Sequence, residues 1–315
     1  MEEKKLVIVS VPYKPFLSVV KAGCKITNVS FLIVEYRKFW VWKVLFRLCF
    51  ALRLYTLATK CKISTNNFKE FRKFSKNSST RFLFWSPFYL PWWISMSHLI
   101  PQNDKKCFCW GPAGNAQNIK KRERYINMAK NLGIAFYTMN ASDANKYGMF
   151  YTTQCYRYFN DETMDETKYD FFFLGYKKGR EKILLSLQNK LQQKGFSTNF
   201  IIRDHNQPET DFSENVKLAK QSRCIVDIVA SQSIYKQDGM TLRPLEALFL
   251  GKKLITNFNK IKEFDFYHPN NIYIIDEQFD LNSLESFMQK PYHTINDDIV
   301  KKYEVNNWIN RYFME

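Results

Sequence analysis

The second half of the sequence alternates between short apolar runs and longer segments of helical length. The apolar runs are Tyr169–Leu174, Thr198–Arg203, Cys224–Val229, Lys253–Asn257 and Asn271–Ile275. The helical segments between and after them are Arg180–Lys194, Ser213–Gln221, Leu242–Leu250 and Leu281–Met288. Continuous apolar runs of strand length, separated by helices, are typical of a parallel sheet that is buried on both faces. Right-handed crossovers then predict a Rossmann-like domain whose ligand site lies at the carboxyl ends of the strands.

The first half shows a looser version of the same alternation. Its strand-length runs are Leu6–Val9, Val29–Tyr36, Arg81–Trp85, Lys106–Trp110 and Ala135–Met139, and its helical segments are Ser18–Cys24, Asn118–Asn131 and Asp143–Tyr147. A polar, acidic run at 161–168 separates the halves. We therefore expect an α/β protein with one layered domain over residues 1–160 and a second over 161–300. A closing helix over 301–315 could cross back onto the first domain, anchored by Trp308 and Phe313.

The chain is strongly basic, with a formal net charge of +17 over 315 residues. Such a charge favours polyanionic partners, namely nucleic acid, an anionic membrane or phosphorylated ligands. The seven cysteines are an odd number, and the C-x-C spacing of Cys107 and Cys109 lacks the second pair typical of a zinc site. We expect reduced thiols, no metal and a cytoplasmic protein. The apolar run after Lys4 and Lys5 is too short for a secretory signal.

The segment from 238 to 257 is expected to form a loop, a helix and a strand. Thr241 is a candidate N-cap because its hydroxyl can accept a backbone amide proton, and Gly251 is a candidate C-cap. The free amides of the helix start favour an anion, and Arg243 adds a guanidinium suited to phosphate. Glu246 lies about one turn further on and could accept hydrogen bonds from a ribose diol. An ordinary surface helix carrying Arg and Glu is the equally weighted alternative.

Three loops should converge on the carboxyl edge of the second sheet. The first is G-Y-K-K-G-R, in which Gly175 permits a tight turn and Lys177, Lys178 and Arg180 could bind phosphate. It matches neither the Walker pattern nor G-x-G-x-x-G. The second loop, residues 203–205, follows the next strand and ends in a histidine that could contact a base or phosphate, or simply lie at the surface. The third loop, residues 230–240, leads into the helix described above. The single carboxylate in the apolar run at 224–229, Asp227, is more plausibly structural than catalytic.

Residues 37–60 combine apolar and basic side chains. Lys43 and Arg47 share one helical face, while Trp40, Val44 and Leu48 share another. A basic amphipathic helix with aromatic residues suits the surface of an anionic membrane. The favoured alternative is an outer helix whose apolar side lies in the core, and the two interpretations are compatible.

The aromatic stretch at 88–93 could line a groove for a sugar or an acceptor. Aromatic residues in such a stretch more often pack in a core or a loop, so packing is the favoured interpretation.

The C-terminal half resembles bacterial glycosyltransferases of the GT-B fold from lipopolysaccharide-core and capsule gene clusters. The resemblance covers residues 140–315 and depends on Y-D-F-F-F-L-G-Y-K-K-G-R at 169–180, C-I-V-D-I-V at 224–229, G-M-T-L-R-P-L-E-A-L-F-L-G-K-K-L-I-T-N at 239–257 and F-Y-H-P-N-N-I-Y-I-I at 266–275. It implies two Rossmann-like domains facing across a cleft, with the acceptor on the N-terminal domain and a nucleotide-sugar on the C-terminal one. The position seven residues before Glu246 is Gly239, so the E-x7-E pattern of many relatives is absent.

The resemblance also implies a donor site. Glu246 matches the ribose-binding glutamate, Thr241 and Arg243 match the diphosphate-binding helix start, and the loop at Gly175 faces the donor. The complete set of candidate donor-binding residues is Gly175, Lys177, Lys178, Arg180, Arg203, Gly239, Met240, Thr241, Leu242, Arg243 and Glu246.

The resulting hypothesis is a metal-independent glycosyltransferase that needs no cofactor. Its acceptor would be a lipopolysaccharide, lipooligosaccharide or capsule glycan, presented as a glycolipid or oligosaccharide at the inner membrane. No D-x-D motif is present to hold a metal, so cations and the helix dipole would neutralise the leaving diphosphate. His98, Asp104 and Glu123 are weak candidates for a catalytic base. Two alternatives stay open: a basic nucleic-acid-binding protein, for which no recognised motif exists, and an inactive glycosyltransferase-like scaffold.

Overall fold

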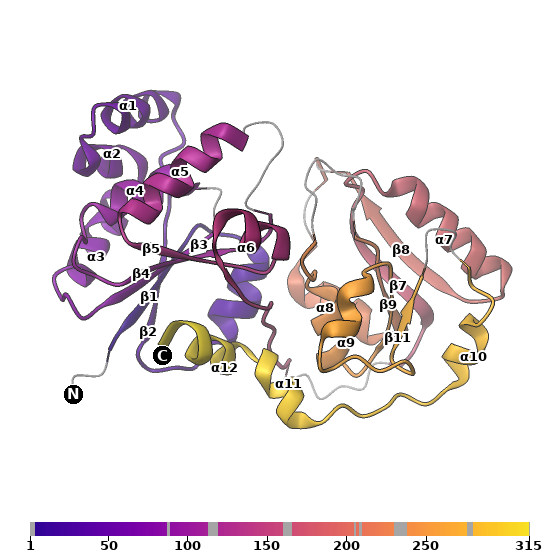
Figure 1. Ribbon diagram of the computed structural model, residues 1–315. Coiled ribbons are helices and arrows are strands. Elements are labelled where there is room, and N and C mark those ends of the chain that lie inside the picture. Colours follow the sequence, from indigo (N-terminus) through magenta and orange to yellow (C-terminus); the bar gives the residue numbers. More distant parts are fainter. Residues whose placement is uncertain are drawn as a thin grey trace. The chain divides into compact units, whose positions relative to one another are not determined.

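The computed structural model describes residues 4–86, 89–112, 119–159, 166–204, 206–207, 210–229, 238–275 and 280–314. The chain divides into two compact units (Figure 1). The N-terminal unit contains Met1–Leu17, Cys24–Thr153 and Ile309–Glu315, and the C-terminal unit contains Ser18–Gly23 and Gln154–Trp308. The sequence prediction set the boundary at residue 160, whereas the chain enters the C-terminal unit directly after Thr153.

The N-terminal unit is built on a six-stranded parallel sheet with the order β2-β1-β3-β4-β5-β6. The strands are β1 (Leu6–Ser10), β2 (Val29–Ile33), β3 (Arg81–Trp85), β4 (Lys105–Cys109), β5 (Ile134–Thr138) and β6 (Phe150–Tyr151). All five residues of β1 are buried, on both faces of the sheet. This is the double burial that its unbroken apolar sequence predicts.

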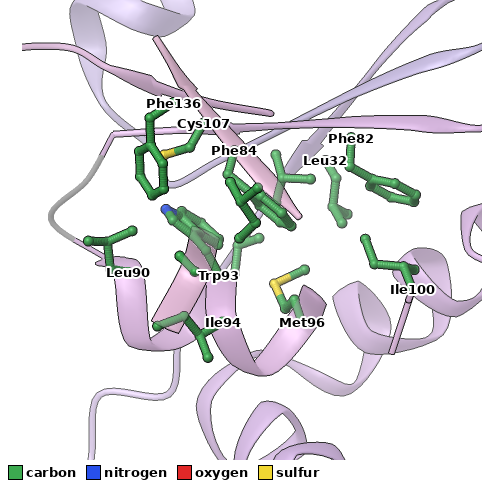
Figure 2. Packing of buried hydrophobic residues seen from close by; sticks show 14 of the residues in the cluster. Leu32, Phe82, Phe84, Leu90, Trp93, Ile94, Met96, Ile100, Cys107 and Phe136 are labelled. Carbon is green, nitrogen blue, oxygen red and sulfur yellow. The ribbon is translucent and has the colours of Figure 1, made fainter. Parts of the chain in front are cut away.

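One face of this sheet is covered by α3 (Thr65–Phe74), α4 (Leu90–Ser97) and α5 (Ile119–Asn131). Figure 2 shows Trp93 of α4 beneath Phe84 and Phe136 of the strands. Trp93 is fully buried, so packing explains this residue of the aromatic stretch, whereas Phe88 lies outside the described residues. On the other face Phe108 contacts Phe313 of η5 (Asn310–Met314). The end of the chain therefore belongs to the core of the N-terminal unit.

Residues 37–60 contain most of two helices, α1 (Trp40–Ala51) and α2 (Tyr55–Lys62). α1 packs mainly on α2, and α2 packs on α4. α1 also contacts α5 through Phe50 and Tyr125, so α1 lies outside the helices that cover the sheet. The remaining helical elements of the first half are η1 (Phe16–Lys21) and α6 (Ala141–Tyr147). Over the described part of the chain, no helix has both the length and the apolar character needed to cross a membrane.

The C-terminal unit has a five-stranded parallel sheet with the order β11-β10-β9-β7-β8. Its strands are β7 (Tyr169–Tyr176), β8 (Thr198–Arg203), β9 (Ser222–Asp227), β10 (Lys253–Thr256) and β11 (Ile272–Ile274). Its helical elements are α7 (Glu181–Gln193), α8 (Phe212–Lys220), α9 (Arg243–Phe249), η4 (Asn259–Glu263), α10 (Leu284–Gln289), α11 (Asp297–Tyr303) and α12 (Val305–Ile309). Each strand and helix expected between 169 and 288 is present, and the two units confirm the α/β class with two Rossmann-like domains.

Candidate functional site

The candidate site lies where the order of strands in the C-terminal sheet changes direction. β7 pairs with β8 on one side and with β9 on the other, so the chain winds outward in both directions from β7. In open parallel sheets of this kind, the crevice for a ligand opens at such a switch point, beyond the carboxyl ends of the strands. The residues after β7 and β9 are therefore the first to consider.

Arg180 joins the ends of these two strands. Its side chain is only 6% exposed, and its guanidinium donates hydrogen bonds to the carbonyl oxygens of Tyr176 and Ile228. Burial lowers the pKa of Arg180 to about 10, and the neighbouring Arg243 acts in the same direction. At neutral pH the side chain remains protonated, so a buried positive charge lies at the switch point.

Arg243, the first residue of α9, brings a second guanidinium to the same place. Its Nη2 donates to the carbonyl oxygen of Leu174 at 2.7 Å, and its Nη1 lies 3.4 Å from Oδ1 of Asp227. A Cβ atom at Gly175 would lie only 2.5 Å from Nη2. Gly175 is thus required for the close approach of Arg243 to β7, a role distinct from the tight turn expected from the sequence.

Lys178 is the third cation of the cluster. Its φ is +43°, in the left-handed region that non-glycine residues rarely occupy, and the following Gly179 has φ +79°. Such backbone strain is concentrated at functional sites. Desolvation lowers the pKa of Lys178, and the charges of Arg180 and Arg243 lower it further. The three cations are therefore close enough to repel one another.

Lys177, in contrast, is compensated by acidic neighbours. Its Nζ lies 2.7 Å from Glu181 and 3.1 Å from Asp204. These hydrogen bonds raise its pKa. Of the three basic residues in this loop, Lys177 is thus paired with acidic residues, whereas Lys178 and Arg180 belong to the cluster of cations.

Asp227 is the acidic counterpart within the cluster, and it is fully buried. Its Oδ1 accepts hydrogen bonds from Thr241 and Arg243, and its Oδ2 accepts one from Thr256. Asp227 therefore positions Thr241 and Arg243, which agrees with its predicted structural role. Among the described residues, the three cations outnumber the nearby carboxylates Asp227 and Glu246, so the carboxyl edge has a net positive charge that an anionic ligand would balance.

Thr241 is not the N-cap of α9. The cap position belongs to Leu242, which makes no side-chain capping bond, and the helix begins at Arg243. The Thr241 hydroxyl donates to Asp227 and accepts a proton from the Arg243 amide at 3.3 Å. The expected hydrogen bond from a first-turn amide to Thr241 is therefore present, although the cap position itself lies one residue later.

Glu246 is buried, with 5% of its surface exposed, rather than directed into bulk water. Its Oε1 accepts hydrogen bonds from the Tyr156 hydroxyl at 3.1 Å and from Nδ2 of Asn215 at 2.8 Å. Burial raises the pKa of Glu246 to about 7, although Arg243 and the two hydrogen bonds oppose the rise. Tyr156 and Asn215 could not be identified from sequence patterns, because the fold brings them to Glu246 from distant segments.

The other donor-binding candidates lie around this cluster. Met240 is buried, and its carbonyl oxygen accepts a hydrogen bond from Gln154 at 3.4 Å. Arg203 ends β8, next to Tyr176 of β7, and its carbonyl oxygen accepts from the Lys177 amide. Gly239 and Leu242 flank the segment that carries Thr241. His205 and residues 230–237 of the third loop lie outside the described residues.

The candidate bases in the N-terminal unit are not brought together. His98 follows α4 and stacks on Tyr55 with ring centroids 3.6 Å apart. Asp104 directly precedes β4 and pairs with Arg81. Both residues therefore lie toward the amino ends of the strands, opposite the edge where ligands bind in such sheets. This placement counts against them as catalytic bases.

Glu123, the third candidate base, lies on α5. Its carboxylate pairs with Lys146 at 2.9 Å. Both side chains are at the surface. This ion pair accounts for Glu123 without a catalytic role.

Comparison with known proteins places the fold. Neither a model of a known protein family nor a curated protein sequence matches the chain. Among solved structures it is similar to an α,α-trehalose-phosphate synthase (UDP-forming) from Burkholderia xenovorans in complex with glucose-6-phosphate, with a TM-score of 0.60, 9% identity and 98% of each chain covered. It is also similar to the apo form of the lipopolysaccharide outer core galactosyltransferase WaaB, with a TM-score of 0.52, 12% identity and 98% and 99% of the two chains covered. The fold is thus of the GT-B type, over 98% of the chain.

Proposed function

We propose that this protein is a glycosyltransferase whose C-terminal unit binds a nucleotide-sugar through its diphosphate. The observation that carries the proposal is the cluster of Lys178, Arg180 and Arg243 at the switch point of the sheet, opposed within it by the buried Asp227. Guanidinium groups form strong, directional hydrogen bonds with phosphate oxygens. In a fold of the GT-B type, a diphosphate is the ligand that this charge and position fit best.

The cluster also supplies the chemistry of the leaving group. During transfer, an acceptor hydroxyl oxygen bonds to the anomeric carbon of the donor sugar while the bond from that carbon to the diphosphate oxygen breaks. The hydroxyl proton passes to a base or to water, and a nucleoside diphosphate leaves. Fixed cations stabilise the negative charge that develops on the leaving oxygen. Arg180 and Arg243 can do so directly, which favours a metal-independent reaction.

Glu246 is the proposed ribose-binding residue. Among the described residues, Tyr156 and Asn215 donate hydrogen bonds to its carboxylate, and in both cases Oε1 is the acceptor. Oε2 therefore remains available to accept a bond from a ribose hydroxyl. Tyr156 and Asn215 would then act as positioning residues, because they fix the orientation of the carboxylate.

The acceptor that we propose is a lipopolysaccharide, lipooligosaccharide or capsule glycan. The sequence resemblance of residues 140–315 is its main support, and the likeness in fold to WaaB agrees with it. A lipid-linked acceptor requires the enzyme to work at the cytoplasmic face of the inner membrane, and residues 37–60 are the part that we assign to that contact. The N-terminal unit would hold the acceptor glycan.

Thermal-shift and transfer assays with UDP-, GDP-, CMP- and ADP-sugars test this function. One of these donors should raise the melting temperature, because a ligand that binds only the folded state stabilises it. Arg243→Met should abolish that rise, whereas Lys177→Met should keep it, because Lys177 is already paired with acidic residues. Lack of response to every donor, combined with a response to oligonucleotides, would contradict the proposal and favour a nucleic-acid-binding protein.

A further inference from the structure

Exposed apolar side chains are concentrated in one part of the N-terminal unit. Nine of the sixteen large hydrophobic side chains that the described residues expose lie between positions 39 and 57. They are Phe39, Trp40, Val41, Val44, Leu45, Leu48, Leu52, Leu54 and Leu57, here called the apolar surface. Phe39 and Trp40 are 77% and 72% exposed, respectively. Exposed apolar patches of this kind mark interaction sites on soluble domains.

The apolar surface is not the core-facing side of α1. The side chains that α1 turns toward the protein include Phe46, its one buried residue, and the partly buried Trp42 and Phe50. At 100° per residue, the exposed apolar residues of α1 occupy a separate sector of about 140°. The face named in the sequence analysis, Trp40, Val44 and Leu48, lies in this exposed sector, so the favoured interpretation that it packs in the core is wrong.

The position of α1 in the fold leaves this second face uncovered by the described residues. α1 packs on α2, which in turn packs on α4, and α4 covers the sheet (Figure 1). α1 is thus an addition to the layers of the Rossmann-like domain rather than one of them. Its outward residues contribute little to folding, so another function must explain them.

Positive charge accompanies the apolar surface. Between residues 36 and 69 the chain has no Asp or Glu, and its cations there are Arg37, Lys38, Lys43, Arg47, Arg53, Lys60, Lys62 and Lys69. None of the ion pairs among the described residues involves these cations. Lys43 and Arg47 lie on α1 beside the apolar sector. Burial is the main cause that lowers the pKa of Lys62, and the nearby charges of Lys43 and Arg47 lower it further. Lys62 is buried, but the exposed cations of this set are still available to an external anion.

We propose that α1 and the turn after it dock on an anionic lipid bilayer, with the apolar surface at the level of the acyl chains and the flanking cations on the headgroups. An amphipathic helix in the membrane plane needs this combination of an apolar sector, aromatic residues and a basic border. Each cation near an anionic bilayer strengthens binding by roughly fivefold. A second copy of the chain is a poorer occupant, because its own cations would meet those of the first. The proposal deepens the membrane contact that the proposed function assigns to residues 37–60, and vesicle binding tests it without glycosyl transfer.

Vesicle sedimentation tests the proposal. The protein should bind vesicles that contain phosphatidylglycerol, bind phosphatidylcholine vesicles far less, and dissociate as salt is added. The double variant Val44→Asp/Leu48→Asp should lose at least roughly tenfold in affinity, because both side chains are removed from the apolar surface. Lys43→Glu/Arg47→Glu should also weaken binding. Leu185→Asp is the matched control. Leu185 of α7 is 45% exposed but lies in the C-terminal unit, so this variant should bind vesicles as the parent protein does.

Two outcomes would overturn the proposal. The first is equal binding of the parent protein and the Val44→Asp/Leu48→Asp variant to anionic vesicles. The second is a parent protein that ignores vesicles but forms a dimer that the same variant disrupts in sedimentation velocity, which would assign the apolar surface to a second copy. The donor-induced rise in melting temperature should survive in every one of these variants, so a failure of this proposal can be distinguished from a failure of the enzymatic one.

Discussion

The two units share the same strand order around their first strand. They also share a buried lysine at the amino edge of the sheet. In each unit the fourth strand begins with a buried lysine, Lys105 in β4 and Lys253 in β10. Lys105 donates to the carbonyl oxygens of residues 100, 101 and 103, and Lys253 donates to those of residues 270 and 287. Both lysines therefore satisfy backbone carbonyls, and burial lowers the pKa of each.

The carboxyl edges of the two sheets differ. At the switch point of the C-terminal sheet, Arg180 and Arg243 bring buried positive charge. At the equivalent point of the N-terminal sheet, beyond β1 and β3, the neighbours are aromatic: Trp85 contacts Trp110, and Trp110 contacts the exposed Tyr13. The two sheets therefore repeat a buried lysine at the amino edge and differ in the chemistry of the carboxyl edge. A charged edge suits a diphosphate, whereas an aromatic edge suits an uncharged sugar.

The largest expected effect concerns the shared amino edge. Lys105→Met and Lys253→Met should each lower the free energy of unfolding by about 3 kcal/mol, because buried carbonyl groups lose their donors. Urea denaturation measures this loss. Lys105→Met should leave nucleotide affinity unchanged. If either variant is as stable as the parent protein, the two buried lysines do not stabilise the amino edges of their sheets in the same way.

A second prediction concerns the pH dependence of the charged unit. The pKa of Glu246 is about 7 in the folded protein against 4.5 for an ordinary glutamate. The folded state thus holds this proton more tightly than the unfolded state, so the contribution of Glu246 to stability is fully present below pH 4.5 and is lost as the pH rises through 7. Between pH 5 and pH 7 the loss should be about 2 kcal/mol.

Glu246→Gln should remove this dependence, because its side chain does not titrate. Urea denaturation of both proteins at the two pH values measures the difference. Glu123→Gln serves as the control, since Glu123 is a surface carboxylate paired with Lys146. Identical pH slopes for the parent protein and Glu246→Gln would show that Glu246 is not held protonated by burial.

The smallest expected effect sharpens the assignment of the carboxyl edge. Gly175→Ala places a methyl group where Nη2 of Arg243 lies, so the guanidinium must move while the fold stays intact. We expect nucleoside diphosphate affinity to fall roughly tenfold, with little change in melting temperature. Calorimetric titration measures the affinity. Gly195→Ala is a useful comparison, because Gly195 has open space around it but φ +82°, so it should cost stability and not affinity.

The sequence predicted the scaffold better than the contacts within the site. Apolar runs located every strand of the C-terminal sheet, because burial on both faces leaves no room for polar residues. The helix that carries Arg243 and Glu246 was likewise predicted from its turn and capping residues. Asp227 was recognised as a single carboxylate in an apolar strand, and its structural role was the favoured interpretation.

Contacts between distant segments could not be predicted in the same way. Tyr156 and Asn215 reach Glu246 only because the fold brings three segments together. The roles of Lys105 and Lys253 were missed for the same reason, since their carbonyl partners lie in turns without any pattern and, for Phe287, in α10. The two apolar faces of α1 were also ambiguous, because periodicity shows that a face exists and not what covers it.

The most direct test of the central claim is a calorimetric titration that compares a nucleoside diphosphate with the corresponding nucleoside. The preferred base is the one identified by the thermal-shift screen. If the cluster of Lys178, Arg180 and Arg243 binds a diphosphate, the diphosphate should bind far more tightly than the nucleoside, and Arg243→Met should weaken only the diphosphate, by roughly thirtyfold. Equal affinities for the two ligands, or an Arg243→Met protein that binds the diphosphate as tightly as the parent does, would contradict the account.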